Sequence, residues 1–148
     1  MLYVERILKH IHAYDEKTLA HAMRVAAYTA SSPFLSLEEQ DYAIALAIGH
    51  DLIEDTKITI EDIESYDLQR GLTYLTKTKD KSYKEYCVSI KEMADIDWIG
   101  KCAYIVKLAD MKDHLSLTET LTDKLKAKYL EGLAVLLWVE EKKLTQKT

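Results

Sequence analysis

Apolar side chains recur at intervals of three and four residues along most of the chain, the spacing that places them on one face of an α-helix. The clearest faces comprise three sets: Leu2, Tyr3, Ile7 and Ile11; Leu19, Met23, Ala26 and Ala30; and Leu121, Leu125, Leu133, Leu136 and Leu137. Four glycines and one proline are too few for the many turns of an all-β domain. The pattern therefore predicts an all-α fold.

Helix-start signals divide this pattern into separate elements. Ser36, Thr59 and Ser82 each precede an acidic residue by three positions. This is the capping box, in which the hydroxyl and the carboxylate satisfy free backbone N–H groups. Asp15 and Asp97 are suitable N-caps for two more helices. The predicted helices cover residues 2–13, 17–31, 37–50, 60–66, 69–76, 83–94, 98–111 and 122–142.

The length of 148 residues suits one hydrophobic core, and no repeat or long polar linker divides the chain. We predict a single domain over residues 1–148, a bundle of about seven or eight helices with its core within residues 2–142. The final residues, KKLTQKT, are polar, and we expect them to form a frayed tail.

Composition narrows the class of protein. The net charge of -5 argues against a nucleic-acid partner, because a phosphate-binding surface is usually basic. No apolar run reaches the length of about 18 residues that a membrane span needs, and no export signal is apparent. Cys87 and Cys102 form no CxxC pair, so we expect reduced core thiols in a cytoplasmic protein.

Candidate chemistry lies at the ends or on the faces of three apolar segments. His21, the His50–Asp51 pair and Asp110 are each attached to a helix that must be buried on one side. A buried carboxylate is costly unless it is paired or binds a metal. Two imidazoles and two carboxylates suit Mn²⁺, Fe²⁺, Zn²⁺ or Mg²⁺ with open water positions. Taken singly, His21 could be a core histidine and Asp110 a helix C-terminal residue; their combination indicates a metal site.

The order His, His-Asp, Asp resembles that of the HD-domain metal phosphohydrolases, which implies their all-α fold. Within that group, HDLIEDT (residues 50–56) is similar to the HDxxEDT segment of the RelA/SpoT-type guanosine polyphosphate (ppGpp) 3′-pyrophosphohydrolases, including their small stand-alone forms. VKLADMKDHL (residues 106–115) resembles their VKLADxxxNL segment. The resemblance extends from about residue 17 to about residue 136; it is specific at residues 50–56 and 106–110 and loose elsewhere.

The resemblance implies a role for each residue of the centre. One divalent ion, typically Mn²⁺, is bound by His21, His50, Asp51 and Asp110. Glu54 and Asp55 orient the water that the ion activates or accept its proton, and the implied reaction is hydrolysis of the 3′-pyrophosphate of ppGpp. The alternative for Glu54 and Asp55 is a solvated helix end.

Candidate substrate contacts come from the remaining cations and aromatic residues. They are Lys17, Lys77, Lys79, Tyr83, Tyr86, Lys112, His114, Lys124, Lys128 and Tyr129. Each lysine could instead be an exposed surface charge, and the tyrosines at 83 and 86 could be packing residues. Arg24 could reach the pocket or pair with a surface acid.

One segment departs from the family pattern. The family's substrate loop, RKxxxPYIxHP, corresponds here to YDEKTLAHA, where only Lys17 keeps a positive charge, and the family asparagine after the metal aspartate corresponds to His114. Two alternatives therefore stay open: an HD-domain phosphatase acting on a nucleoside monophosphate or NADPH, and a non-catalytic nucleotide sensor. In every case the expected partner is a small phosphorylated nucleotide, without nucleic acid or membrane, and the oligomeric state is open.

Overall fold

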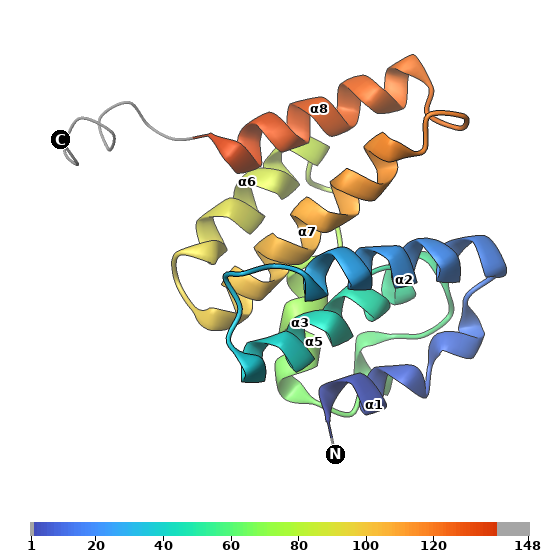
Figure 1. Cartoon of the computed structure of the whole chain (residues 1–148), viewed down its shortest axis with the longest axis vertical. Helices are drawn as coiled ribbons and strands as arrows, with labels where there is room; N and C mark the ends of the chain where they lie inside the picture. The colour runs from blue at the N-terminus through green and yellow to red at the C-terminus, as the bar shows by residue number, and fades with distance from the viewer. Residues whose placement is uncertain (1, 139–148) are drawn as a thin grey trace, which may run out of the picture.

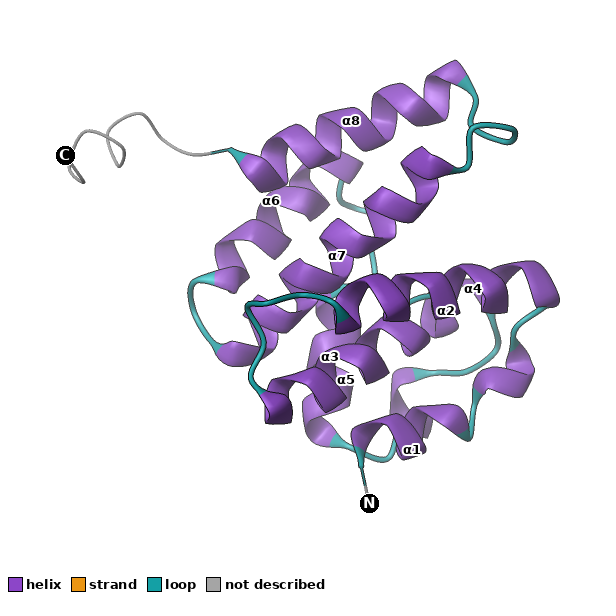
Figure 2. Ribbon diagram, viewed as in Figure 1, coloured by secondary structure: helices purple, strands orange, loops and turns teal. Residues whose placement is uncertain are grey.

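The computed structural model describes residues 2–138, and these residues form α-helices and 3₁₀ turns without any β-strand. Figure 2 shows the helices joined by short loops. The elements are α1 (Tyr3–Leu8), η1 (Ile11–Ala13), α2 (Glu16–Ala30), α3 (Leu37–Gly49), α4 (Leu52–Asp55), η2 (Ile60–Asp62), α5 (Tyr66–Tyr74), α6 (Tyr83–Ala94), α7 (Trp98–Ser116) and α8 (Asp123–Leu137). The predicted all-α bundle is confirmed.

The predicted helix starts are confirmed at four positions. Ser36 and Ser82 form complete capping boxes at the starts of α3 and α6. Asp15 and Asp97 accept backbone N–H groups at the starts of α2 and α7. At Thr59 the carboxylate of Asp62 accepts the backbone N–H, but only the short turn η2 follows. Local hydrogen-bonding chemistry therefore sets most of the element boundaries.

Several predicted boundaries were wrong. The segment 2–13 divides into α1 and η1, although it contains neither glycine nor proline. The segment 60–66 is not a helix, because Ser65 caps a new helix that begins at Tyr66. The helix predicted to end at residue 111 continues to Ser116. Helix α8 ends at Leu137, and the rest of the predicted segment, with the predicted tail, lies outside the described residues.

Helices α3 and α7 form the centre of the bundle. Helix α3 packs against α1, α2, α5 and α7, while α6 and α8 pack on α7 and on each other. In Figure 1, α8 crosses one end of the molecule and α1 lies at the other. The second half of α3, residues 45–49, is buried throughout, so this helix ends inside the protein. The chain therefore delivers the residue after Gly49 to the interior.

The two cysteines are buried free thiols, as predicted for core residues. Burial raises the pKa of Cys87, and it raises the pKa of Cys102 to about 12. Among the described helices, none combines the length and the apolar character that crossing a bilayer requires.

Candidate metal centre

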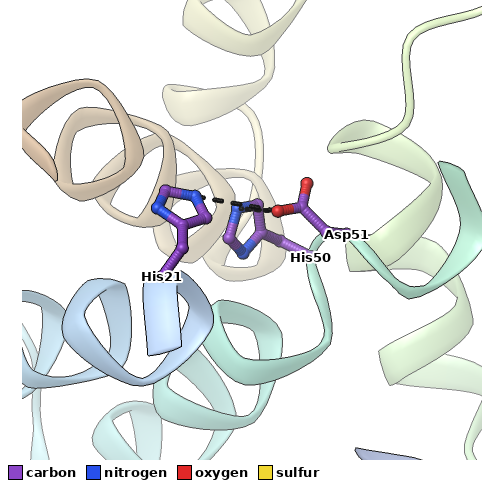
Figure 3. Close-up of side chains that lie close together, drawn as sticks. All are labelled: His21, His50 and Asp51. Atoms are coloured by element: carbon purple, nitrogen blue, oxygen red, sulfur yellow. Dashed lines mark ion pairs between the residues drawn. The ribbon is translucent and has the colours of Figure 1, made fainter. Parts of the chain in front are cut away.

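The four predicted metal ligands lie together where three helices meet. His50 follows the buried C-terminus of α3, and Asp51 is the N-cap of α4. His21 projects from α2 and Asp110 from α7. The side chains of His21, His50 and Asp110 are each less than 10% exposed, and Asp51 is partly exposed. Figure 3 shows the two imidazole rings beside the Asp51 carboxylate.

The atoms that can bind a cation converge. Nε2 of His21 and Nε2 of His50 lie 2.9 and 3.1 Å from Oδ1 of Asp110. Nε2 of His50 also lies 3.2 Å from Oδ2 of Asp51, and the corresponding distance from His21 is 3.7 Å. Two nitrogens and two carboxylate oxygens thus surround one point. This donor set is one that divalent metals accept.

The protons of the two imidazoles support this assignment. Nδ1 of His50 lies 2.6 Å from the carbonyl oxygen of Ala47, which can only accept, so Nδ1 carries a proton. Nδ1 of His21 likewise donates to Asp113 Oδ2 at 2.6 Å. In a neutral ring the lone pair is then on Nε2, where it faces carboxylate oxygens. A cation between these atoms, or a second proton on each ring, removes the repulsion.

Without a metal ion, protons must remove this repulsion, and protonation of His50 is then strongly favoured. Burial opposes the charged ring, but the carboxylates of Asp51 and Asp110 outweigh it and raise the pKa of His50 to about 9. Burial also opposes the charged form of His21, but the hydrogen bonds that its ring donates to Asp110 and Asp113 outweigh burial and raise its pKa. The centre therefore has a strong demand for positive charge. One divalent ion supplies the positive charge that two added ring protons would otherwise supply.

Asp113 was not among the predicted site residues, yet it holds His21 in place. Its carboxylate, about 1% exposed, accepts from His21 and from Nε and Nη2 of Arg24 at 2.7 and 3.0 Å. Arg24 therefore neither enters the cleft nor pairs with a surface acid. Its spacing could have indicated a place near the centre, because Asp113 is three residues after Asp110 and so lies on the same side of α7. A carboxylate behind a ligating imidazole fixes its orientation and makes it more basic.

Lys107 is a second residue of this site that was not predicted. It is buried, and its Nζ donates to Oδ2 of Asp110 at 2.8 Å. The ammonium group lies over the rings of Tyr83 and Tyr86, with 5.4 and 5.0 Å to their centroids. Burial opposes ionisation of Asp110, but Lys107 and His50 keep its pKa well below the usual value. The ion pair leaves Oδ1 of Asp110 facing the imidazoles.

A cleft of about 240 Å³ opens beside the metal ligands, and Glu54 and Asp55 line it. Oε1 of Glu54 accepts the backbone N–H of Lys77 at 2.6 Å, which fixes this carboxylate against the loop after α5. Partial burial raises the pKa of both Glu54 and Asp55, and the charge of Asp51 adds to it; in Glu54 the hydrogen bond from the Lys77 backbone opposes the rise without cancelling it. Raised carboxyl pKa values beside a metal set are typical of proton-accepting groups.

Six of the ten predicted substrate contacts line this cleft: Lys77, Tyr83, Tyr86, His114, Lys128 and Tyr129. Tyr86 is nearly buried, and its hydroxyl donates to the carbonyl of Leu75 at 2.7 Å. Tyr86 is therefore a packing residue, which was the alternative to its predicted role as a substrate contact. The other five are partly or fully exposed.

The other four predicted contacts do not line the cleft: Lys17, Lys79, Lys112 and Lys124. Lys112 is two residues after Asp110, hence roughly 200° around the helix, and its Nζ lies over the ring of Tyr28 beside a different cavity. Lys124 is one turn before Lys128 on α8 and is exposed to solvent. Lys17 and Lys79 are likewise exposed. Short sequence distance from a site residue did not place these side chains in the site.

No family model matches the chain, and no curated protein matches it. The chemical assignment therefore depends on the geometry. The buried cluster of His21, His50, Asp51 and Asp110 has the donors and the convergence to hold a metal ion.

Asp113→Asn is expected to weaken metal binding by about 10–100-fold while the protein remains folded. The amide is uncharged and cannot make His21 as basic a ligand. Isothermal titration with Mn²⁺ and Zn²⁺ measures the change. The matched control is Asp123→Asn, which alters an exposed aspartate in the first turn of α8. Equal metal affinity in Asp113→Asn and the wild type would rule out the supporting role.

Proposed function

We propose that the protein is a metal-dependent phosphohydrolase of the HD-domain type, whose preferred reaction is hydrolysis of the 3′-pyrophosphate of ppGpp. One observation carries the proposal. A buried His/Asp metal set, two carboxylates with raised pKa values and several lysines all face a single cleft. A metal site that served only structure would be closed by its protein ligands and would need no such neighbours.

The metal ligands fit a divalent ion, for which the family resemblance implies Mn²⁺. Bound to His21, His50, Asp51 and Asp110, such an ion supplies a water with a lowered pKa and neutralises phosphate charge. Lys107 keeps Asp110 ionised, and Asp113 keeps the Nε2 lone pair of His21 directed at the centre.

Glu54 is the proposed general base. Its carboxylate lies in the cleft one turn after Asp51, and a raised pKa makes it a better proton acceptor near neutral pH. The hydrogen bond from the Lys77 backbone holds one oxygen, which leaves the second oxygen to take the proton. Asp55 faces the same cleft and orients the attacking water.

Cations of the cleft hold the phosphates in this proposal. Lys77 and Lys128 reach the cleft from the loop after α5 and from α8. Nζ of Lys128 lies 4.6 Å from the centroid of the Tyr83 ring, so the ammonium group is held over an aromatic face. Its charge is directed at the cleft, where it stabilises the negative charge of the phosphoryl groups in the transition state.

A substrate panel tests the proposal. With Mn²⁺, the purified protein is expected to release pyrophosphate from ppGpp. The absence of Lys17 from the cleft favours keeping nucleoside monophosphates and NADPH in the panel. Phosphate release from one of these, with ppGpp unchanged, would overturn the preferred substrate. Binding of a nucleotide without any turnover would indicate a sensor instead of an enzyme.

Lys128→Met is expected to lower kcat/KM by on the order of 10-fold or more, since a hydrogen bond to a charged group contributes about 1.5–3 kcal/mol. Steady-state kinetics measure the loss. Lys124→Met is a closely matched control, because the same residue type is changed one helical turn away on the same exposed helix. If both variants lose the same activity, general surface charge explains the effect and the proposed contact is wrong.

A further inference from the structure

We infer that His114 is a fifth protein ligand of the metal, joining the two histidines and two aspartates described above. This inference rests on the metal centre of the proposed function. It extends that centre, because the family pattern has an asparagine at this position. The proposal concerns coordination and is independent of which nucleotide is hydrolysed.

Three imidazole rings converge on one oxygen atom, Oδ1 of Asp110. Nε2 of His114 lies 3.2 Å from Oδ1 of Asp110. The Nε2 atoms of His21 and His50 lie 2.9 and 3.1 Å from that same oxygen. A carboxylate oxygen has two lone pairs and so does not accept three N–H groups in good geometry. Three Nε2 lone pairs and one carboxylate oxygen can all be satisfied by a single cation.

Two ring contacts fix the orientation of the His114 imidazole. Its plane stacks on the ring of Tyr129 from α8, with centroids 4.5 Å apart and an interplanar angle of 7°. Its centroid is also 4.5 Å from that of His21. The ring is thus held between two helices with Nε2 directed at the centre. A histidine that served only as a surface residue would need neither contact.

His114 lies on the cleft side of the metal centre. The side chain of His114 is about 31% exposed, whereas those of His21 and His50 are nearly buried. His114 also lines the cleft. It therefore occupies the side of the centre from which a ligand approaches. Coordination by His114 links the metal, through the Tyr129 stack, to the helix that carries Lys128.

A change in metal preference follows from a third imidazole. Imidazole nitrogen suits Zn²⁺, Fe²⁺ and Co²⁺, while carboxylate and water suit Mn²⁺ and Mg²⁺. His114 should therefore raise affinity for Zn²⁺ more than for Mn²⁺. His114→Asn, which installs the family residue, is expected to weaken Zn²⁺ binding by at least about 10-fold and Mn²⁺ binding by less. His12→Asn, at an exposed histidine, is the matched control.

The direct test is long-range ¹H–¹⁵N NMR of the ¹⁵N-histidine protein during titration with Zn²⁺. The chain has five histidines, and His10 and His12 serve as internal references. We expect the Nε2 signals of His21, His50 and His114 to shift together as Zn²⁺ is added. The two reference signals should not move.

The outcomes separate this inference from the proposed function. If Zn²⁺ shifts the signals of His21 and His50 while those of His114 do not move, the fifth ligand is wrong and the metal centre stands. If no histidine shifts, the metal centre fails, and both proposals fail with it. If all three shift but the substrate panel shows no turnover, the coordination is upheld and the hydrolase assignment is overturned.

Discussion

Asp110→Asn is expected to abolish tight metal binding and to lower hydrolysis by on the order of 10³-fold or more. Oδ1 of Asp110 is the atom on which the imidazoles of His21 and His50 converge. An amide has no charge to offer a divalent ion. The loss corresponds to the several kcal/mol that a metal contributes to phosphoryl chemistry. Metal content of the purified protein and kcat/KM for ppGpp are the measurements.

The same substitution should also destabilise the protein, and this effect must be separated from the chemical one. Lys107 is buried against Asp110, and removing one partner of a buried ion pair costs about 3–5 kcal/mol. Urea denaturation of the metal-free protein measures that loss. The double variant Lys107→Met/Asp110→Asn removes both charges and should recover much of the stability without recovering metal binding. Normal metal content in either variant would contradict the assignment of Asp110 as a ligand.

Glu54→Gln is expected to lower kcat by about 10²–10⁴-fold, the usual contribution of a general base, without changing metal affinity. Glutamine keeps the shape of the side chain, and its amide oxygen can still accept the backbone N–H of Lys77. Only the capacity to take a proton is lost. Single-turnover kinetics with saturating ppGpp isolate the chemical step.

Two further variants make this result specific. Glu38→Gln alters an exposed glutamate in the first turn of α3 and should leave the rate unchanged. Asp55→Asn should have a smaller effect than Glu54→Gln, because orienting the water is the lesser role. Equal rates in Glu54→Gln and the wild type would contradict the proposed base. If Asp55→Asn alone lost activity, the roles of the two carboxylates would be exchanged.

Much of the helical architecture could be predicted from local chemistry. Ser36, Ser82, Asp15 and Asp97 start helices because a side-chain oxygen beside free backbone N–H groups acts within three residues. The break between α1 and η1 could not be predicted, because no glycine or proline marks it. At the break, Nζ of Lys9 pairs with the distant carboxylate of Glu64, and just after η1 the Tyr14 hydroxyl donates to the carbonyl of Ile48.

The four candidate metal ligands could be selected from the sequence because their residue types are costly on buried helix faces. Lys107, three residues before Asp110, was a possible partner for that carboxylate, but a common cation explained all four of His21, His50, Asp51 and Asp110 together. Their convergence required the fold, because helices far apart in the chain bring them together. The contact between Asp113 and His21 likewise could not be predicted without the fold. Asp113 was visible as a spacing on α7, but its contact with His21 spans 92 residues.

By itself, the sequence determined the residue types available for chemistry, the helices that carry them and the face of each helix that is apolar. The tertiary structure alone decided which side chains share a cleft. It placed Lys128 inside and Lys124 outside, and it turned Lys112 away from the centre while His114 turned toward it. The physical reason is that helical periodicity defines directions around one axis. The rotation of that helix against its neighbours is decided by packing between residues far apart in the chain.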